Sequence, residues 1–332
     1  MAVLSLNPWM LVGFLLATYA VVANDSLQTL GTFIASNQRQ TPKTLQVLFI
    51  STITFVVLML GWHLHGGDPA WGRLESFPVP DPFSWVYVLP PITVVVLTAW
   101  GAPVSTSLLL LACVAPGNTG QLVGRSLGGY GFAFITGLIT WGVGLRVMEQ
   151  WVVPTDQERP STTAAWRGLQ WCSTGLLWGV WLVQDLANLF VFVPRHLALQ
   201  PMLACSLLLC LGTGGLVACN GGPLQAVLAN KTNSSDLRSA TMIDAVLGLC
   251  LLLEAVLSPF PLSTTWVFLG LLAGREVAIR ITNHQLSAPI PGHDTQPVAG
   301  VIGHDLYKAG IGLGVSLGIA FCLQPLIRWS GG

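Results

Sequence analysis

Long apolar stretches separated by polar loops run along the whole chain. An apolar stretch of about 20 residues can cross a bilayer as a helix. In the first half, spans are expected at about residues 9–35, 44–64, 83–100 and 126–148, with a kink in the third at Pro90-Pro91. Residues 108–116 form a fifth apolar stretch. It is too short to cross and predicts a half-helix or re-entrant segment, which a membrane protein tolerates where it is buried in protein or lines a water-filled path.

The second half of the chain repeats this order. Spans are expected at about residues 166–193, 201–218, 241–257 and 306–327, and a short apolar stretch ends near residue 273. We therefore predict an all-α polytopic membrane protein with broken helices and short re-entrant or half-helix segments. Its parts are an N-terminal transmembrane repeat (1–148), a linker (149–165) and a C-terminal transmembrane repeat (166–332). Lys and Arg residues do not mark one side of the membrane, so they leave open whether the repeats are inverted.

The composition supports a membrane protein and argues against several other classes. Of the 332 residues, 52% are hydrophobic and 8% are charged, against about 25% charged residues in soluble domains. The net charge is zero, and no basic surface suggests nucleic acid as a partner. The seven cysteines lack C-x-x-C spacing, so we interpret them as small hydrophobic residues rather than a metal site or disulfide framework. We expect an integral protein of the plasma (inner) membrane, in contact with the lipid bilayer and without a cofactor.

An amide–aspartate pair lies within one apolar stretch of each half. Asn24-Asp25 is midway along the first span, and Gln184-Asp185 comes 160 positions later, near the end of the span 166–193. A carboxylate at the centre of a bilayer costs about 2.5–3.5 kcal/mol on insertion scales, and such residues usually serve a function. Carboxylate and amide oxygens suit a hard cation such as Na⁺. The four side chains predict a cation site, and each pair predicts a break in its helix; the alternative is a structural role beside neighbouring hydroxyls.

A hydroxyl-rich motif also occurs once in each half, just before the short apolar stretch. The motifs are Pro-Val-Ser-Thr-Ser at 103–107 and Pro-Leu-Ser-Thr-Thr at 261–265. Proline and hydroxyl residues are favoured at a helix start, and an exposed helix N-terminus binds anions. Interrupted helices at matching places of two repeats are typical of the central site of a transporter. We predict oxyanion contacts from Ser105, Thr106, Ser107, Ser263, Thr264 and Thr265; the alternative is that they are ordinary helix caps.

These motifs resemble signatures of the inorganic phosphate transporter (PiT) family. In the first half they are Ala23-Asn24-Asp25 with Gly31-Thr32, and Gly-x-Pro-Val-Ser-Thr-Ser; in the second half, Asp-x-Ala-Asn at 185–188 and Pro-Leu-Ser-Thr-Thr look like their repeats. The resemblance implies inverted repeats, secondary active transport of phosphate coupled to Na⁺ or H⁺, and a homodimer. It also implies a central site of the Asp pairs and hydroxyl motifs, with Gln28 and Asn188 supporting the broken helices beside the substrate.

The chain departs from the family pattern at several positions. The family usually has Asn-Asp-x-Ala-Asn in both halves, whereas here Gln28 and Gln184 each stand in place of one Asn. Val191 replaces an expected Gly, and the His expected after each Ser-Thr pair is absent. Gln keeps the amide but reaches one methylene further. These changes leave open whether the substrate is phosphate, sulfate or another oxyanion, and which ion is coupled.

Two other classes of function compete with a transporter. Asp25 and Asp185 could form the catalytic carboxylate pair of an intramembrane enzyme, or the chain could be a sensor that binds its ligand without transporting it. The repetition of both motifs favours a transporter, so we predict that the protein is not an enzyme. Of the other acidic residues, we expect Asp244 near a membrane interface, and Glu254 is a candidate for a cation or proton site.

Overall fold

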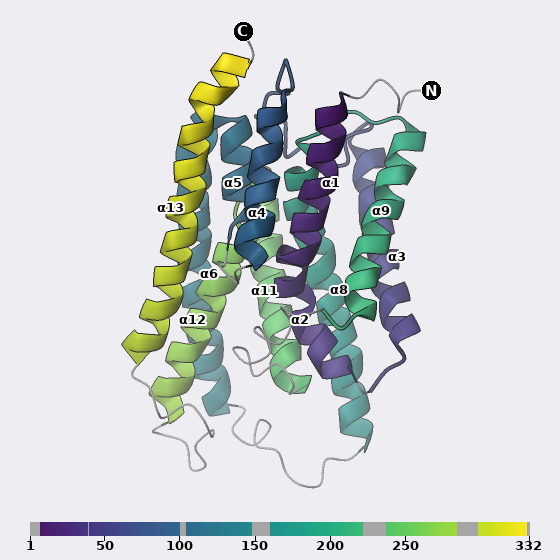
Figure 1. Cartoon of the computed structure of the whole chain (residues 1–332). Helices are drawn as coiled ribbons and strands as arrows, with labels where there is room; N and C mark the ends of the chain where they lie inside the picture. Colours follow the sequence, from purple (N-terminus) through teal and green to yellow (C-terminus); the bar gives the residue numbers. More distant parts are fainter. Residues whose placement is uncertain are drawn as a thin grey trace.

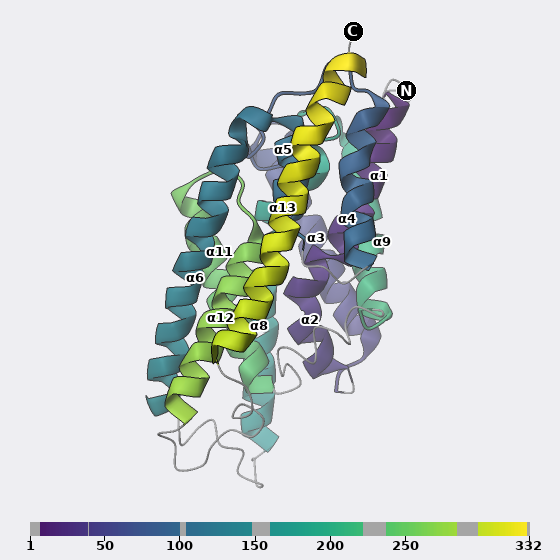
Figure 2. The same cartoon turned by 60° about the vertical axis from the view of Figure 1, so that its left-hand side comes forward.

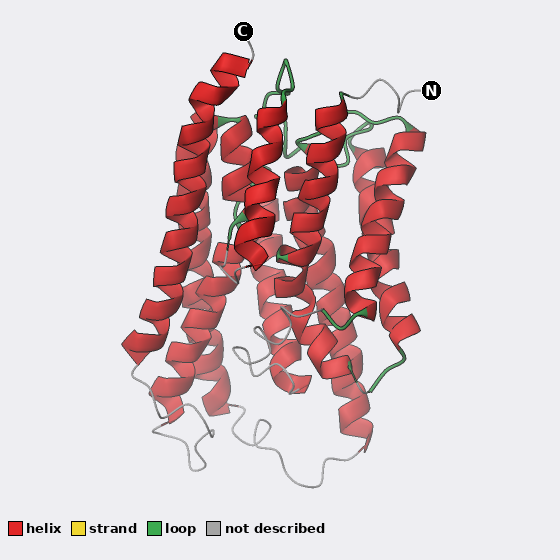
Figure 3. Cartoon of the chain, in the orientation of Figure 1, coloured by secondary structure: helices red, strands yellow, loops and turns green. Residues whose placement is uncertain are grey.

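Every regular element that the structure describes is a helix (Figure 3). The computed structural model describes residues 7–38, 40–99, 104–147, 160–221, 237–283 and 298–330. Within these residues, four helices are long and apolar enough to cross a membrane, and a fifth span results if the first two helices, bent by 48°, count as one. The predicted all-α polytopic membrane fold is therefore confirmed.

The first half follows the predicted order of spans. Its elements are α1 (Pro8–Ala23), α2 (Asp25–Asn37), α3 (Lys43–Leu64), the 3₁₀ turn η2 (Trp85–Val88), α4 (Leu89–Ala99), α5 (Thr106–Val114), the 3₁₀ turn η3 (Pro116–Asn118) and α6 (Thr119–Val147). The break predicted at Asn24-Asp25 separates α1 from α2. The short helix predicted at 108–116 is α5, which has nine residues.

The second half has fewer breaks than its sequence predicts. Its elements are α8 (Pro160–Phe190), α9 (Leu199–Ala218), α11 (Leu237–Leu257), α12 (Thr264–Asn283) and α13 (Val298–Ser330). Residues 149–159 of the predicted linker lie outside the described residues, and α8 begins at Pro160, within that linker. The exact division of the chain into repeats stays a prediction.

Corresponding helices of the two halves run in opposite directions (Figures 1 and 2). In Figure 1, α1 and α2 run downward from the upper end of the bundle, where α1 begins and α13 ends, whereas α8 runs upward. Helices α3 and α9 run opposite to each other, as do α6 and α13. The repeats are therefore inverted, as the family resemblance implies.

Three local predictions are wrong. Pro90 and Pro91 do not kink a helix, because they lie in the first turn of α4, where a missing N–H breaks no helical hydrogen bond. The second short segment does not end near residue 273: α12 has 20 residues, because its polar end is held by Arg275–Ser239 and Arg280–Glu276 contacts. Finally, α8 runs unbroken through Gln184-Asp185. Both side chains bind partners beside the helix, so the backbone hydrogen bonds of α8 stay intact.

Glycines bring α6 and α12 into close contact. A methyl group at Gly270 or Gly274 would overlap the carbonyl oxygens of Tyr130 and Phe134 on α6. Small residues let membrane helices approach in this way. This contact fixes the position of the first turn of α12.

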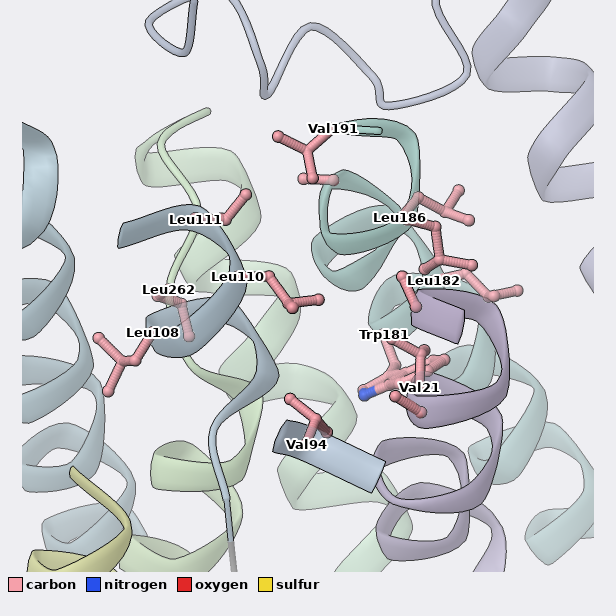
Figure 4. Packing of buried hydrophobic residues seen from close by; sticks show 14 of the residues in the cluster. Val21, Val94, Leu108, Leu110, Leu111, Trp181, Leu182, Leu186, Val191 and Leu262 are labelled. Carbon is pink, nitrogen blue, oxygen red and sulfur yellow. The ribbon is translucent and has the colours of Figure 1, made fainter. Parts of the chain in front are cut away.

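The space around α5 is filled by apolar side chains. Leu108, Leu110 and Leu111 of α5 are fully or almost fully buried, and Figure 4 shows Leu110 pointing toward α8 while Leu108 lies beside Leu262. A half-helix in a membrane protein must be enclosed by protein in this way. The packing holds the start of α5 in the interior of the bundle.

Candidate functional site

The first turn of α5 lies against the amide–aspartate pair of its own half. Ser105 caps α5 by accepting a 3.1 Å hydrogen bond from the Leu108 N–H. Thr106 donates its hydroxyl to Asp25 Oδ2. Asn24 Nδ2 donates to Asp25 Oδ1 at 2.7 Å and to the Val104 carbonyl at 3.0 Å. The break between α1 and α2 and the start of α5 therefore form one buried unit.

The first turn of α12 meets the second aspartate in the same way. Thr264 Oγ1 donates to Asp185 Oδ2 at 2.7 Å, and Asn188 Nδ2 donates to Asp185 Oδ1 at 2.7 Å. Ser263 lies at the start of α12, where its hydroxyl accepts from the Trp266 N–H at 3.4 Å and its own N–H donates to Ser126 Oγ at 3.0 Å. Both halves thus place a threonine hydroxyl on a buried carboxylate.

Several hydrogen bonds at the cluster join the two halves. Ser107 of α5 donates to Asp185 Oδ1 at 3.4 Å, and Asn188 Nδ2 reaches Ser107 Oγ at 3.0 Å. Thr265 donates to the Val104 carbonyl at 3.5 Å. Helices α5 and α12 start at mid-depth and run toward opposite ends of the bundle (Figures 1 and 2). Their N-termini therefore converge on one cluster.

Three buried side-chain oxygens, one on Asn188 and two on chain neighbours of the aspartates, have no hydrogen-bond partner. They are Gln184 Oε1, Asn188 Oδ1 and Ser26 Oγ, all buried, while Gln184 Nε2 donates to the Leu251 carbonyl at 3.2 Å. Leaving a buried acceptor unsatisfied costs about 1–3 kcal/mol. Amide and hydroxyl oxygens beside carboxylates are the ligands of a hard cation. The donor set therefore fits Na⁺ chemically.

The carboxylates of this cluster have no direct cationic partner. Asp25 and Asp185 are each 1% exposed, and the charge of Asp185 acts on Asp25. Within the described residues, neither forms an ion pair with Lys or Arg. Two buried like charges repel, so the cluster favours a bound cation. The two helix N-termini beside them favour an anion.

Eleven of the twelve predicted site residues come together here, and one does not. Asn24, Asp25, Gln184, Asp185, Asn188 and the six hydroxyl residues are all buried in or beside the cluster. Gln28 is half-buried on α2, and its side chain has no hydrogen bond within the described part of the chain. It occupies the position that Asn188 has in the other half, so the two positions are not equivalent in space. The longer side chain of Gln28 does not reproduce the contacts of Asn188.

The sequence reasoning missed several members of the cluster. The Val104 carbonyl accepts hydrogen bonds from both halves, Ser26 Oγ is buried without a partner, and Ser126 binds the start of α12. A backbone carbonyl leaves no sequence signal. Ser26, next to Asp25, could have been included on position alone.

Two acidic residues elsewhere have structural partners. Asp244 is fully buried, and it accepts hydrogen bonds from Thr32 and Thr174, each at 2.5 Å. Glu254 pairs with Arg125 at 3.0 Å. Among the described residues, no group of three His, Cys, Asp or Glu side chains could hold a metal ion.

The comparisons with known proteins concern the fold. No family model matches the chain, and no curated protein matches its sequence. A solved structure described as "The sodium-dependent phosphate transporter" superimposes with a TM-score of 0.65 and 13% sequence identity, covering 97% of this chain and 97% of that chain. The chain therefore shares, over almost its whole length, the fold of a structure described as a sodium-dependent phosphate transporter.

Proposed function

We propose that the protein is a secondary active transporter of the PiT type, which moves inorganic phosphate across a membrane together with Na⁺. The observation that carries this proposal is the meeting of two helix N-termini and their hydroxyls with two buried aspartates. The shared fold and the printed function of the structural neighbour support phosphate as the substrate.

The hydrogen bonds of the cluster supply a reason for coupling. A threonine hydroxyl has one proton to donate. Thr106 and Thr264 now give theirs to Asp25 and Asp185. When phosphate takes these donors, the carboxylates lose them while remaining buried. A cation must then take the place of the hydroxyl donors that each carboxylate has lost. Phosphate binding therefore favours Na⁺ binding, and by linkage Na⁺ binding favours phosphate binding.

The cation is assigned to Na⁺ on the same grounds. The unpaired oxygens of Gln184 and Asn188 can coordinate a metal cation. Asn24 Nδ2 and the Val104 carbonyl hold Asp25 in position. H⁺ coupling remains an outcome of the test below.

The alternatives from the sequence have less support. A catalytic aspartate pair does not need hydroxyl motifs, yet here the hydroxyls occupy both carboxylates. A sensor without flux would bind phosphate but not accumulate it. Sulfate fits the same donors but carries no proton of its own at neutral pH, so it belongs in the experiment as a competitor.

The test is uptake of radiolabelled phosphate into proteoliposomes with an inward Na⁺ gradient, a K⁺ gradient or a pH gradient. We expect uptake in the Na⁺ arm alone, with little inhibition by equimolar sulfate. Uptake that needs only the pH gradient would change the coupled ion. Absence of flux in every arm, or stronger uptake of sulfate, would contradict the proposal.

A further inference from the structure

Arg73 is held rigidly near the upper end of the bundle. It lies in the loop between α3 and η2, where Asp68 accepts the N–H groups of Ala70 and Gly72 at 2.8 and 2.9 Å. Trp71 and Gly72 adopt left-handed backbone conformations with φ of 59° and 71°. Its side chain is 4% exposed. The loop thus places a guanidinium inside the protein.

The guanidinium of Arg73 has donors to spare. Of its five N–H groups, the structure uses one Nη1 group, which donates to the Pro259 carbonyl at 3.3 Å. Its Nε is buried without a partner. Within the described part of the chain, no carboxylate lies at ion-pair distance from it. An uncompensated buried charge is costly, so this residue points to a missing anionic partner.

Arg195 shows what a structural arginine looks like at the same end. Its two Nη groups donate five hydrogen bonds of 3.1–3.4 Å, all to backbone carbonyls, namely those of Phe190, Val191, Val193, Phe77 and Pro78. The turn after α8 is fastened by this arginine. The Nε of Arg195 is also buried without a partner, so the two arginines differ in their Nη groups. Those of Arg73 make one such bond, so fastening the loop does not account for them.

A second arginine adds to the positive charge. Arg125 on α6 pairs with Glu254 at 3.0 Å, and its Nε is also buried without a partner. Burial is the main cause that lowers the pKa of Arg73 to about 10, and the charge of Arg125 is the second, whereas the charge of Asp185 raises this pKa. Arg73 is therefore still protonated at neutral pH. Arg125 has one carboxylate at ion-pair distance and Arg73 has none, so the two guanidiniums together keep a net positive charge.

This pair of arginines adjoins the start of α12. Pro259, which binds Arg73, precedes Thr264 by five positions. Ser126, next to Arg125, accepts the N–H of Ser263. Building on the proposed function, we propose that Arg73 and Arg125 form a second oxyanion site, which holds phosphate between the upper end of the bundle and the central aspartates.

Glu254 then acts as a competitor for this site. Arginine binds phosphate through paired N–H···O bonds, and Glu254 competes for the Nη2 group of Arg125 that can form one of them. Arrival of phosphate therefore exchanges one anionic partner of Arg125 for another. This makes opposite predictions for the two neighbours: loss of Arg73 weakens phosphate binding, and loss of the Glu254 charge strengthens it.

The experiment measures phosphate binding to the purified protein by equilibrium dialysis at saturating Na⁺, and phosphate uptake in proteoliposomes. Arg73→Gln should raise both Kd and KM about tenfold, the loss of one charged hydrogen-bonding partner. Arg73→Lys should restore part of the lost phosphate affinity. Glu254→Gln should lower the Kd for phosphate about threefold or more. Arg195→Gln, the matched control, should lower thermal stability but leave the KM of the folded fraction unchanged.

The outcomes separate this site from the central one. Flux in the wild type with an unchanged Kd and KM in Arg73→Gln would overturn the second site and leave the transporter intact. If Arg73→Gln changes only the Na⁺ concentration that gives half-maximal uptake, Arg73 is a counter-ion of Asp185, and the second oxyanion site is overturned. Phosphate binding weakened by Arg73→Gln without flux in the wild type would support the site and contradict transport. If Arg73→Gln does not fold, Glu254→Gln decides: a Kd that is unchanged or higher overturns the site.

Discussion

Thr264 Oγ1 donates a 2.7 Å hydrogen bond to Asp185 Oδ2 and so joins the first turn of α12 to α8. Thr106 makes the corresponding bond to Asp25 in the other half. Within each of the inverted repeats, the aspartate of the first motif thus accepts a hydrogen bond from the threonine hydroxyl of the second motif. This pairing explains why the two motifs keep nearly the same offset along the chain.

The Thr264 hydroxyl is expected to contribute directly to phosphate affinity. Thr264→Val keeps the shape and removes the donor, so the KM for phosphate should rise about 10- to 100-fold, since a hydrogen bond to a charged group contributes about 1.5–3 kcal/mol. Thr264→Ser keeps the donor and should stay within about threefold of the wild type. Uptake kinetics at saturating Na⁺ check this. Equal KM values for the Val and Ser variants would show that the hydroxyl is only a structural partner of Asp185.

The Gln184 amide is expected to bind the cation rather than the anion. Its Oε1 is buried without a partner, and Gln184→Met removes this oxygen at similar volume. The Na⁺ concentration for half-maximal uptake should rise about three- to tenfold, as expected for one lost ligand. The KM for phosphate at saturating Na⁺ should change less. If the variant instead raises only the phosphate KM, the amide belongs to the anion site.

The glycine contact between α6 and α12 is expected to position the site. Gly274→Ala forces a methyl group against the Phe134 carbonyl and should lower stability by about 1–3 kcal/mol. It should also raise the phosphate KM, because Thr264 moves with α12. Gly128→Ala is the matched control: it lies on α6 with nothing within 4 Å of an added Cβ. Thermal unfolding in detergent and uptake kinetics would contradict the account if both variants behaved alike.

The Asp244 cluster is expected to stabilise the fold without binding the substrate. Thr174→Val removes one of the two hydroxyls that donate to this buried carboxylate, at a cost of about 1.5–3 kcal/mol. Thr174→Ser keeps the donor and should be close to the wild type. The KM for phosphate should be the same in both. A large change in KM with unchanged stability would place Asp244 in the transport site instead.

The sequence predicted the architecture well because helices that cross a membrane appear in the sequence as long apolar stretches. The break at Asn24-Asp25 and the short helix α5 followed from apolar lengths and repeated motifs, whereas the inversion of the halves was implied by the family resemblance alone. The unbroken α8 did not, because a polar pair inside an apolar stretch looks the same whether it breaks the helix or binds neighbours from the side. The length of α12 was hidden for a similar reason: its polar end is stabilised by a contact with α11 and by an ion pair within the helix, which hydropathy does not record.

The sequence predicted which residues lie together in the candidate site, but not how they are arranged. Repetition identified the aspartates and hydroxyls, whereas the crossing contacts of Ser107 and Thr265 depend on the fold. Gln28 was included by its position in the motif, and only the structure separates it from Asn188. Arg73 was missed because it lies in a loop 112 positions before Asp185, and no local pattern connects the two.

The central claim is that Asp25 and Asp185 hold the cations that allow phosphate to bind and move. Its most direct test is simultaneous uptake of radiolabelled Na⁺ and phosphate into proteoliposomes by the wild type, Asp25→Asn and Asp185→Asn, with folding checked by thermal unfolding. We predict coupled uptake of both ions in the wild type and a loss of both, by at least about 100-fold, in each folded variant, since each loses a buried charged ligand. Normal coupled transport by both variants would contradict the account.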